Sequence, residues 1–552
     1  MAGITNIFEI GRTGIQANQQ GLSTTSHNIT NVGTEGFSRQ RAILETGRPQ
    51  GGIYSTGVRV TDVTRLVDQF IEAQLTDTTQ DFGRFNIRHD LLQRVETVFN
   101  ETDAGGINNA IDRLFNAFRD LSTFPEESSQ RTLVINEAQG LADTINLAAT
   151  TLSQIRKDID DAIGQNLSSV NTIATQIATL NGQIHFAEAN GNTANDLRDR
   201  RAVLVNDMAE LVNIETVEMS NGLAVMVGGQ LLVSGDRNNT LVQVSDADNP
   251  GVNDVAVQRS DGTNFVVTTK INDGEIAGRL TVRDTDIQGY QDRLDRLAAV
   301  LVNEINQQHE AGYGLDGTTT NSLFSALSPD APLAKDTNSG GAAGTSTTIS
   351  TAASLTMDTY EIQFTSATAF NVVNVTDGTT VLSAQAYTSG ATITFDGLDA
   401  VITDGSGAPA AGDAFTVSAH KGAAFDMAVS LTDTDKIAEA STSAGVPGNN
   451  VNALALVAIQ ATSQSTLGGI NVDDYHAVTV GDVGSDTSLA GLQRNAKQIE
   501  MDQVTSLRES VSGVNLDEEL TRLLEFQRAF EASARLITTA DELFQTVLGL
   551  GR

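Results

Sequence analysis

The sequence predicts an α+β multidomain fold, in which terminal helices form a coiled-coil or helical-bundle core and β-rich domains are inserted between them. Three observations support this fold class. Apolar residues recur at helical spacing at both ends of the chain. Two interior stretches change to short runs of β-forming residues separated by turn dipeptides. The 552 residues also suffice for three or four domains of roughly 150 residues each.

The two ends of the chain give the strongest helical signals. The first thirty residues place apolar and small side chains on one stripe: Ile4, Phe8, Gly11, Ile15, Asn18, Leu22, Thr25 and Ile29. The last forty do so more strongly, at Leu516, Leu520, Leu523, Phe530, Ala534, Ile537, Phe544 and Leu548. A second stripe lies beside it: Leu524, Leu536, Leu543 and Val547. Asn515, with Glu518 three residues later, resembles a capping box, so a helix is predicted from about Asn515 to about Leu548.

Further helical patterns fill most of the interior. They cover roughly Val63–Phe99, Ile107–Ser122, Ser128–Ala189 with at least one break, Asp196–Leu211, Asp284–Glu310, Asn452–Ser465 and Ser485–Val511. We therefore expect a helical bundle built from both halves of the chain.

Two stretches predict β structure instead. Residues 212–280 contain short Val-rich runs between the dipeptides Asn221-Gly222, Asp261-Gly262 and Asp273-Gly274. Residues 325–420 are rich in Thr, Ser, Ala and Gly, and Tyr360, Ile362 and Phe364 alternate as one face of a strand does. Within them, the piece from Asn338 to Thr351 is predicted to be a linker or an exposed loop.

These patterns divide the chain into four predicted domains. They are a terminal coiled-coil domain (1–35 plus 515–552), a helical bundle (36–211 plus 281–324 plus 421–514), a β-rich segment (212–280) and an inserted β-rich outer domain (325–420).

Composition excludes several classes of partner and site. The 34 Lys and Arg residues face 69 Asp and Glu residues, and the formal net charge of -35 repels nucleic acid and anionic lipid surfaces. No apolar run is long enough to span a bilayer, so membrane insertion is not expected. Without cysteine, the chain has no disulfide or thiolate metal site. The N-terminus also lacks a cleavable secretory signal, so we expect cytosolic retention or export by another route.

The sequence offers no convincing catalytic, cofactor or metal site. The six histidines are scattered without metal-ligand spacing, and Gly312, Gly314 and Gly317 follow a helix rather than a strand, which favours a helix end and a turn. The acidic groups Asp473-Asp474 and 517–519 could supply a general acid and base. The second group lies in the first turn of a predicted helix, where carboxylates are favourable. We therefore expect no enzyme and no cofactor.

The C-terminal helix is marginally stable by itself. Each apolar side chain on its stripe contributes about 1.5 to 3 kcal/mol when fully buried, whereas ordering the backbone costs about 1 to 2 kcal/mol per residue. Two interpretations follow. The two ends form a coiled coil within one chain, or they become ordered only when many copies pack together. We adopt the second as the hypothesis.

The N-terminal run SHNITNVGTEGFSRQR, residues 26–41, resembles the signature of the bacterial flagellar axial proteins. The matching positions are Asn28, Asn31, Thr34, Gly36, Ser38, Arg39 and Gln40. Glu35 stands where that family usually has proline, and Phe37 where it usually has tyrosine. Residues 512–550 are similar to the closing segment of the family along almost their whole length. Residues 297–324 and 448–456 resemble its hook-associated members.

The resemblance implies a structural subunit located between the flagellar hook and the filament, with the terminal helices forming an inner tube. It also implies type III export through an uncleaved N-terminal signal, so the chain would be cytoplasmic before export and extracellular afterwards. The implied partners are other copies of the chain, the hook protein, a second hook-filament junction protein, the export apparatus and a cytosolic chaperone bound to the C-terminal helix. No cofactor is implied.

Specific residues are assigned to this function. Subunit packing is predicted for the apolar stripes, namely Ile4, Phe8, Ile15, Leu22, Leu516, Leu520, Leu523, Phe530, Ile537 and Phe544. The bend between the inner tube and the helical domain is predicted for the motif residues Asn28, Asn31, Gly36, Arg39 and Gln40. The alternatives are another axial protein (hook, rod or minor filament subunit), a secreted glycan-degrading enzyme that uses Asp473 and Asp474, and an adhesin built on residues 325–420.

Overall fold

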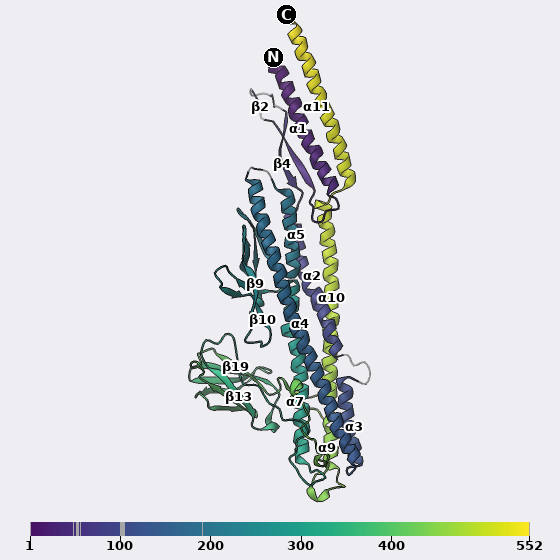
Figure 1. Ribbon diagram of the computed structural model, residues 1–552, viewed down its shortest axis with the longest axis vertical. Coiled ribbons are helices and arrows are strands. Elements are labelled where there is room, and N and C mark those ends of the chain that lie inside the picture. Colours follow the sequence, from purple (N-terminus) through teal and green to yellow (C-terminus); the bar gives the residue numbers. More distant parts are fainter. Residues whose placement is uncertain are drawn as a thin grey trace.

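The computed structural model describes residues 2–47, 49–50, 54–55, 57–99, 105–189, 191 and 193–550. The molecule is elongated (Figure 1). Long helices form a shaft, the two chain ends lie together at one end of it, and the β sheets project from one side. This arrangement confirms the predicted α+β class with long terminal helices and inserted β structure.

Eleven α-helices are described. Their bounds are α1 Ala2–Thr30, α2 Gln69–Phe99, α3 Ile107–Thr123, α4 Ser128–Glu188, α5 Asn195–Leu211, α6 Gly274–Thr281, α7 Ile287–Ala311, α8 Ala423–Asp426, α9 Val451–Ala461, α10 Val472–Ser512 and α11 Leu516–Leu550. A π-helical turn, Val282–Asp286, joins α6 to α7. Short 3-10 helices cover Thr268–Lys270, Ala352–Ser354, Thr434–Lys436, Ser443–Gly445 and Ser465–Leu467.

Three helix predictions were wrong in detail. α4 runs unbroken, because its buried residues recur along its whole length and packing there offsets the weak helix propensity of Gly140 and Gly164. The segment from Val63 does not begin a helix, since Val58–Arg65 is a β-strand. α10 begins at Val472 rather than Ser485, because the Asn471 side chain caps it by accepting a hydrogen bond from the Asp474 amide.

The strands form separate antiparallel sheets. Near the terminal helices lie β1 Gln40–Thr46, β2 Pro49–Gln50, β3 Tyr54–Ser55 and β4 Val58–Arg65, paired as β1-β4 and β2-β3. Beside α4 lie β5 Glu215–Met219, β6 Gly222–Val227, β7 Gln230–Ser234, β8 Arg237–Asn238, β9 Thr240–Ser245, β10 Asn253–Gln258 and β11 Asn264–Val266, in the orders β5-β6-β7-β8 and β11-β10-β9. The outer sheets contain β12 Leu333–Ala334, β13 Ala343–Ile349, β14 Thr359–Ser366, β15 Ala369–Asn374, β16 Thr380–Ala386, β17 Thr392–Phe395, β18 Leu398–Thr403 and β19 Ala414–Ser418, in the orders β12-β19-β14-β15-β16 and β13-β18-β17.

The strand pattern confirms most of the β predictions and corrects two. Tyr360, Ile362 and Phe364 are buried on β14, as their alternation predicts. The piece from Asn338 to Thr351 is not a loop throughout, because β13 pairs with β18 inside it. The dipeptide Asp273-Gly274 is not a turn between strands: Asp273 is the N-cap residue of α6.

The helical core contains a buried ion pair far from the chain ends. Arg131 at the start of α4 and Glu439 are both fully buried, with Arg131 Nη2 lying 2.7 Å from Glu439 Oε2. Arg131 also donates to the carbonyl of Ile437 at 3.0 Å. These contacts fasten the segment after the outer sheets to the end of the shaft opposite the chain ends.

The root of the outer sheets is held on α7 by two carboxylates. His420 Nε2 lies 2.7 Å from Asp292 Oδ1, and the amides of Gly422 and Ala424 donate to Asp295 at 3.0 and 2.9 Å. Burial raises the pKa of Asp295 to about 6. The outer sheets therefore connect to the shaft through polar as well as apolar contacts.

His309 is buried and neutral in α7. The Ala438 amide donates to its Nε2 at 3.0 Å, so its Nδ1 carries the proton and donates to the Asn321 carbonyl at 2.5 Å. Burial lowers the pKa of His309 in the folded chain. Protonation would place a charge in the core and break the bond from Ala438.

We predict that His309 makes the chain less stable in mild acid. Its folded pKa lies below the unfolded value of about 6.5, so the unfolded chain binds protons first and stability falls as the pH drops below that value. His309→Gln should lower the unfolding midpoint at pH 8. Between pH 7.5 and pH 5, however, the midpoint of the variant should fall less than that of the parent chain. Urea unfolding across that pH range measures both effects. His185→Gln, at an exposed position, should keep the parent pH profile; an identical pH profile for His309→Gln would contradict the assignment.

Candidate assembly interface at the chain ends

The two terminal helices approach closely because one of them has small side chains along the contact. A Cβ atom added to Gly11 would lie 2.6 Å from Ile537 Cγ1, and one added to Gly21 would lie 2.6 Å from the Phe526 ring. One added to Gly14 would lie 2.7 Å from Ser533 Oγ. We call this contact the terminal seam, consisting of Gly11, Gly14, Gly21, Phe526, Ser533, Ile537 and Ala540.

The spacing of the small residues explains the pairing. Gly14 and Gly21 are seven residues apart, and Gly11 lies three residues before Gly14, so all three lie along one face of α1. Ala540 on the other helix is fully buried. Of these glycines, the stripe predicted from the sequence contains only Gly11, because that stripe follows large apolar side chains. The signal that could have found Gly14 and Gly21 is this recurrence of glycine.

The structure divides the predicted packing residues into two sets. Phe8, Ile15, Leu22, Leu523, Phe530 and Ile537 are half-buried. Leu516, Leu520 and Phe544 are exposed to 45%, 50% and 38%. The side chain of Ile4 lies outside the described residues. The seam within one chain therefore uses only part of the predicted stripe.

Much of the apolar surface of α11 faces outward. The residues of its second stripe, and those of the first that miss the seam, are between 38% and 57% exposed: Leu516, Leu520, Leu524, Leu536, Leu543, Phe544, Val547 and Leu548. We call this set the α11 outer row. The pairing within one chain, the first of the two interpretations above, thus accounts for one side of the helix, and packing against further copies remains a prediction for the other side.

The motif residues gather where α1 ends and α11 begins, a region that we call the elbow (residues 28–40 and 512–519). Asn28 donates through Nδ2 to the Gln40 carbonyl and accepts from the Gln40 amide, both at 2.9 Å. This reciprocal pair turns the chain from α1 into β1. Asn31 lies just after α1, and its Nδ2 donates to the His27 carbonyl at 2.9 Å, which satisfies one of the last carbonyls of the helix.

A buried carboxylate joins the two ends of the chain at the elbow. Glu519 is 1% exposed and accepts hydrogen bonds from Arg39 Nε at 2.7 Å and from Asn28 Nδ2 at 2.9 Å. Arg39 Nη2 also lies 2.8 Å from Glu518. The Arg39 amide donates to the Ser512 carbonyl, the last residue of α10. The sequence explains Glu518 by the capping box and the helix dipole, and Glu519 by the dipole alone. It does not reveal these partners, because they lie more than 470 residues away along the chain.

Other contacts connect the elbow to the shaft. Gln40 Nε2 donates to Asp196 at 2.8 Å, and the Ser38 amide donates to Asp199 at 3.1 Å. Gly36 has a φ of +72°, and a Cβ atom there would lie 2.1 Å from Val203 Cγ2. Glycine is therefore required both by the backbone conformation and by the close approach of α5.

The acidic groups considered for catalysis are occupied by structural contacts. Asp473 and Asp474 lie in the first turn of α10, where Asn471 bonds Asp474 and Gln460 donates to Asp473 at 3.0 Å. Both aspartates therefore serve the start of a helix. Asp517 lies in the first turn of α11, and its amide donates to the Asn515 side chain at 3.0 Å, as the predicted cap requires.

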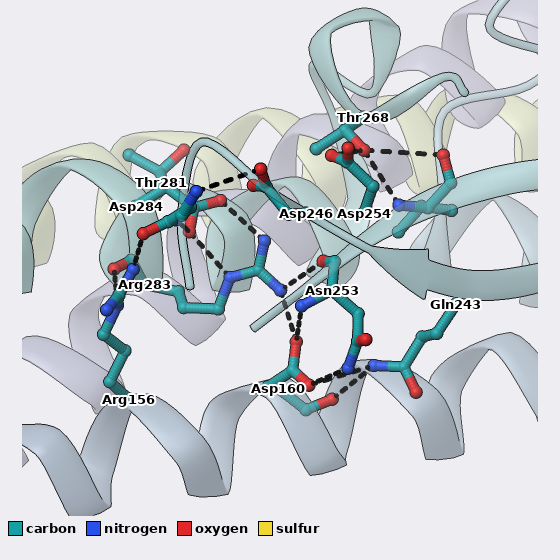
Figure 2. Close-up of polar contacts among 12 residues, drawn as sticks. Arg156, Asp160, Gln243, Asp246, Asn253, Asp254, Thr268, Thr281, Arg283 and Asp284 are labelled. Carbon is teal, nitrogen blue, oxygen red and sulfur yellow. Dashed lines mark hydrogen bonds and ion pairs between the residues drawn. The ribbon is translucent and has the colours of Figure 1, made fainter. Parts of the chain in front are cut away.

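One acidic group has the spacing of a metal site. Carboxylate oxygens of Asp246, Asp254 and Asp336 lie within 4.8 Å of one another. Burial and the neighbouring Asp254 raise the pKa of Asp246. Figure 2 shows Asp246 and Asp254 beside the buried Arg283, but not bonded to it. Nothing else in the described residues indicates a ligand there, so we assign no metal to it.

The network in Figure 2 is structural. Arg283, on the π-helical turn, donates to Asp160 of α4 at 2.5 Å and to the Asn253 carbonyl of β10 at 2.8 Å. Asp160 in turn accepts from the Asn253 side chain at 2.7 Å. These bonds fix the β9-β10 sheet on α4.

Comparison with known proteins agrees with this geometry. Residues 92–324 match the family described as the flagellar hook-associated protein FlgK helical domain. Residues 508–550 match the C-terminal segment of the flagellar basal body rod proteins FlgEFG. Flagellar hook-associated protein 1 of Escherichia coli K12 is 28% identical over 555 residues, covering 99% of this chain and 100% of the relative. The chain is similar to flagellar hook-associated protein 1 along its whole length.

Two further relatives show how widely the similarity extends. Flagellar hook-associated protein 1 of Bacillus subtilis is 26% identical over 561 residues, covering 99% of this chain and 98% of the relative. The solved structure of the flagellar hook junction protein FlgK from Burkholderia pseudomallei is similar in fold, with a TM-score of 0.69 and 19% identity, over 80% of this chain and 100% of that chain. None of the described helices is long and apolar enough to cross a membrane.

We predict that Arg39→Ala loosens the elbow of this hook-associated chain. Removing the guanidinium leaves Glu519 buried without its charge partner, which costs about 3 to 5 kcal/mol. Hydrogen exchange should show faster amide exchange in the first turns of α11 than in the parent chain. Arg39→Lys should rescue only part of this protection, because an ammonium lacks the planar fork through which the guanidinium meets the two glutamates.

Arg59→Ala is the matched control. Arg59 forms an ion pair with Glu45 at 3.1 Å, but both side chains are more than half exposed, so its loss should cost no more than about 1 kcal/mol. If the amides in the first turns of α11 exchanged equally fast in the Arg39→Ala and Arg59→Ala variants, the role assigned to Glu519 would be contradicted.

Proposed function

We propose that this chain is a structural subunit of the bacterial flagellum that forms the hook-filament junction, and that its copies assemble through the paired terminal helices. The main observation behind the proposal is that the residues of the α11 outer row are exposed. One chain pairs α1 with α11 through the terminal seam and leaves eight large apolar side chains of α11 about half exposed. Similarity to flagellar hook-associated protein 1 over 99% of the chain supports the same conclusion.

The exposed residues indicate a contact with several neighbours. Each large apolar side chain that becomes buried contributes roughly 1.5 to 3 kcal/mol. Leu520, Leu524 and Leu536 are each about half exposed, so packing against another copy would remove a large remaining area from water. We assign subunit packing to Ile4, Phe8, Ile15, Leu22, Leu516, Leu520, Leu523, Phe530, Ile537 and Phe544, together with the remaining residues of the α11 outer row.

The elbow has a separate role in this proposal. Its residues fix the direction in which the terminal pair leaves the shaft, because Glu519 holds Arg39 and Asn28 while Gln40 and Ser38 bind α5. A junction layer must present one surface to the hook and another to the filament. A defined angle between an inner helical pair and an outer shaft suits a subunit that does both.

The proposed partners follow from this location. They are other copies of the chain, the hook protein and a second hook-filament junction protein. The chain would reach its site through type III export, and a cytosolic chaperone would cover the α11 outer row before export. Covering that row would remove the exposed apolar surface that otherwise promotes aggregation. The final location would be extracellular, at the flagellum.

We predict that polar substitutions in the α11 outer row abolish assembly without unfolding the chain. Leu524→Ser combined with Leu536→Ser changes residues that are 52% and 47% exposed, so the free chain should keep its unfolding midpoint. Cells carrying this variant should still make hooks but release filament subunits into the medium. Electron microscopy of cells and immunoblotting of the medium measure both outcomes.

The control is Leu231→Ser on β7, an apolar residue of similar exposure, 41%, outside the terminal helices. It should leave filaments attached. The proposal would be wrong if the doubly substituted chain supported filaments as well as the parent chain does, at equal levels of exported protein.

A further inference from the structure

The outward side of α10 carries a second apolar surface, which the described residues leave exposed. Leu489, Leu492 and Ile499 are exposed to 49%, 66% and 68%, followed by Leu507 and Val511 at 46% and 40%. Together with Ala496 and Gln503 they recur every three or four residues and therefore lie on one side of the helix. We call these seven residues the α10 face. Glu500 lies among them, and its carboxylate is paired with Lys497 at 2.9 Å.

Several charged side chains of α10 point inward instead. Lys497 forms an ion pair with Asp81 of α2 at 2.8 Å, and Arg508 forms one with Glu72 at 2.8 Å. Asp486 accepts a hydrogen bond from Tyr290 of α7 at 2.7 Å. The contacts with α2 and α7 thus use charges, whereas the side turned away from them is mainly apolar.

A second uncharged surface lies on α4. Residues 162–184 contain no Asp, Glu, Lys or Arg. The exposed side chains of this segment are small or polar: Gln165, Ser168, Ser169, Thr172, Thr175, Gln176, Thr179 and Gln183. We call the first seven of these residues the α4 face. Phe186, 81% exposed, follows them near the end of the helix.

The hydroxyl groups of the α4 face are already bonded within the helix. Thr172 donates to the Ser168 carbonyl at 3.0 Å, and Thr175 and Thr179 donate to carbonyls four residues earlier, both at 2.9 Å. Ser168 and Ser169 do the same at 3.1 and 3.3 Å. A partner that covers this face therefore displaces little essential hydration and meets the threonine methyl groups, so the desolvation cost is small.

The two faces match in length and in position along the shaft. At 1.5 Å per residue, residues 489–511 span roughly 33 Å and residues 165–186 roughly 32 Å. Both helices run from the end of the shaft that carries α3 and α9 towards the terminal helices, and each face lies in the half nearer to them (Figure 1). Copies placed side by side in one orientation would bring the two faces to the same level.

The net charge of the chain restricts which surfaces of two copies can pack together. Each chain has a formal net charge of -35, so two copies repel each other wherever acidic groups meet. They approach at lowest cost where few unpaired acidic groups meet. The α4 face has no charged residue, and Glu500 beside the α10 face is paired with Lys497 at 2.9 Å. If the apolar residues of the α10 face pack against the bonded hydroxyls and methyl groups of the α4 face, no unpaired charge becomes buried.

We infer that the α10 face of one copy packs against the α4 face of the next copy. This inference rests on the proposed function and specifies a shaft contact in addition to the terminal helices. Because the contact joins two different faces, each copy can bind a neighbour on both sides, which produces a ring or a helical tube rather than a closed dimer.

The absence of cysteine makes the inference directly testable by cross-linking. Chains carrying Leu492→Cys together with Thr172→Cys, Thr175→Cys or Thr179→Cys would be expressed as the sole copy in cells. Mild oxidation of purified flagella should convert at least one of the three double variants into a ladder of covalent dimers, trimers and larger multimers. Single variants should give no ladder, since one thiol per chain can link only two copies.

The control is Leu492→Cys combined with Thr394→Cys, whose second thiol lies on the exposed side of β17 in the outer sheets. It should give no multimers. Dimers from Leu492→Cys alone would mean that the α10 face meets its own copy, and would overturn the inference. Absence of ladders from all three double variants, with the chain present in the purified flagella, would also overturn it while leaving the proposed function intact. Absence of the unsubstituted chain from flagella would instead contradict the proposed function.

Discussion

The bond network around the Glu519 carboxylate is the constraint on which the arrangement of the whole molecule depends. Glu519 lies in the first turn of α11, yet the partners of its carboxylate, Arg39 and Asn28, come from the other end of the chain. Arg39 in turn binds the end of α10 through its backbone amide. One buried carboxylate thus joins α1, α11 and the shaft. A buried charge of this kind stabilises only when every partner is in place, so it fixes one orientation of the terminal helices rather than a range of them.

The terminal helices pack against each other along the terminal seam, but other apolar residues of α11 have no partner within the described part of the chain. Glycines on α1 let the two backbones approach until Ile537 and Phe526 fill the space between them. Larger residues there would hold the helices apart. Outside this contact, Leu524 and Leu536 of α11 stay about half exposed. The chain can therefore keep its pair of ends together while retaining an apolar surface for further copies.

Sequence reasoning succeeded where the signal is local. Asn515 caps α11 as its spacing predicts, and the alternation of Tyr360, Ile362 and Phe364 gives a buried strand face. It failed where partners lie far apart in the chain: nothing near Glu519 in the sequence indicates Arg39. The stretch around β13 was misjudged because its composition resembles a linker, whereas its pairing with β18, some fifty residues later, decides its conformation.

The negative net charge keeps chains apart, whereas assembly requires them to pack together. The distribution of charge over the shaft allows both. A net charge of -35 keeps separate chains apart, which suits a protein with exposed apolar rows. Assembly then requires surfaces on which this repulsion is absent. Lys497 and Arg508 neutralise acidic groups of α2 on the inner side of α10, and Lys497 also pairs with Glu500 beside the α10 face. The α4 face has no charged residue, and its hydroxyl groups are bonded to their own helix. Repulsion elsewhere on the chain then favours contacts made through these two faces and the α11 outer row over other ways of packing the same shafts.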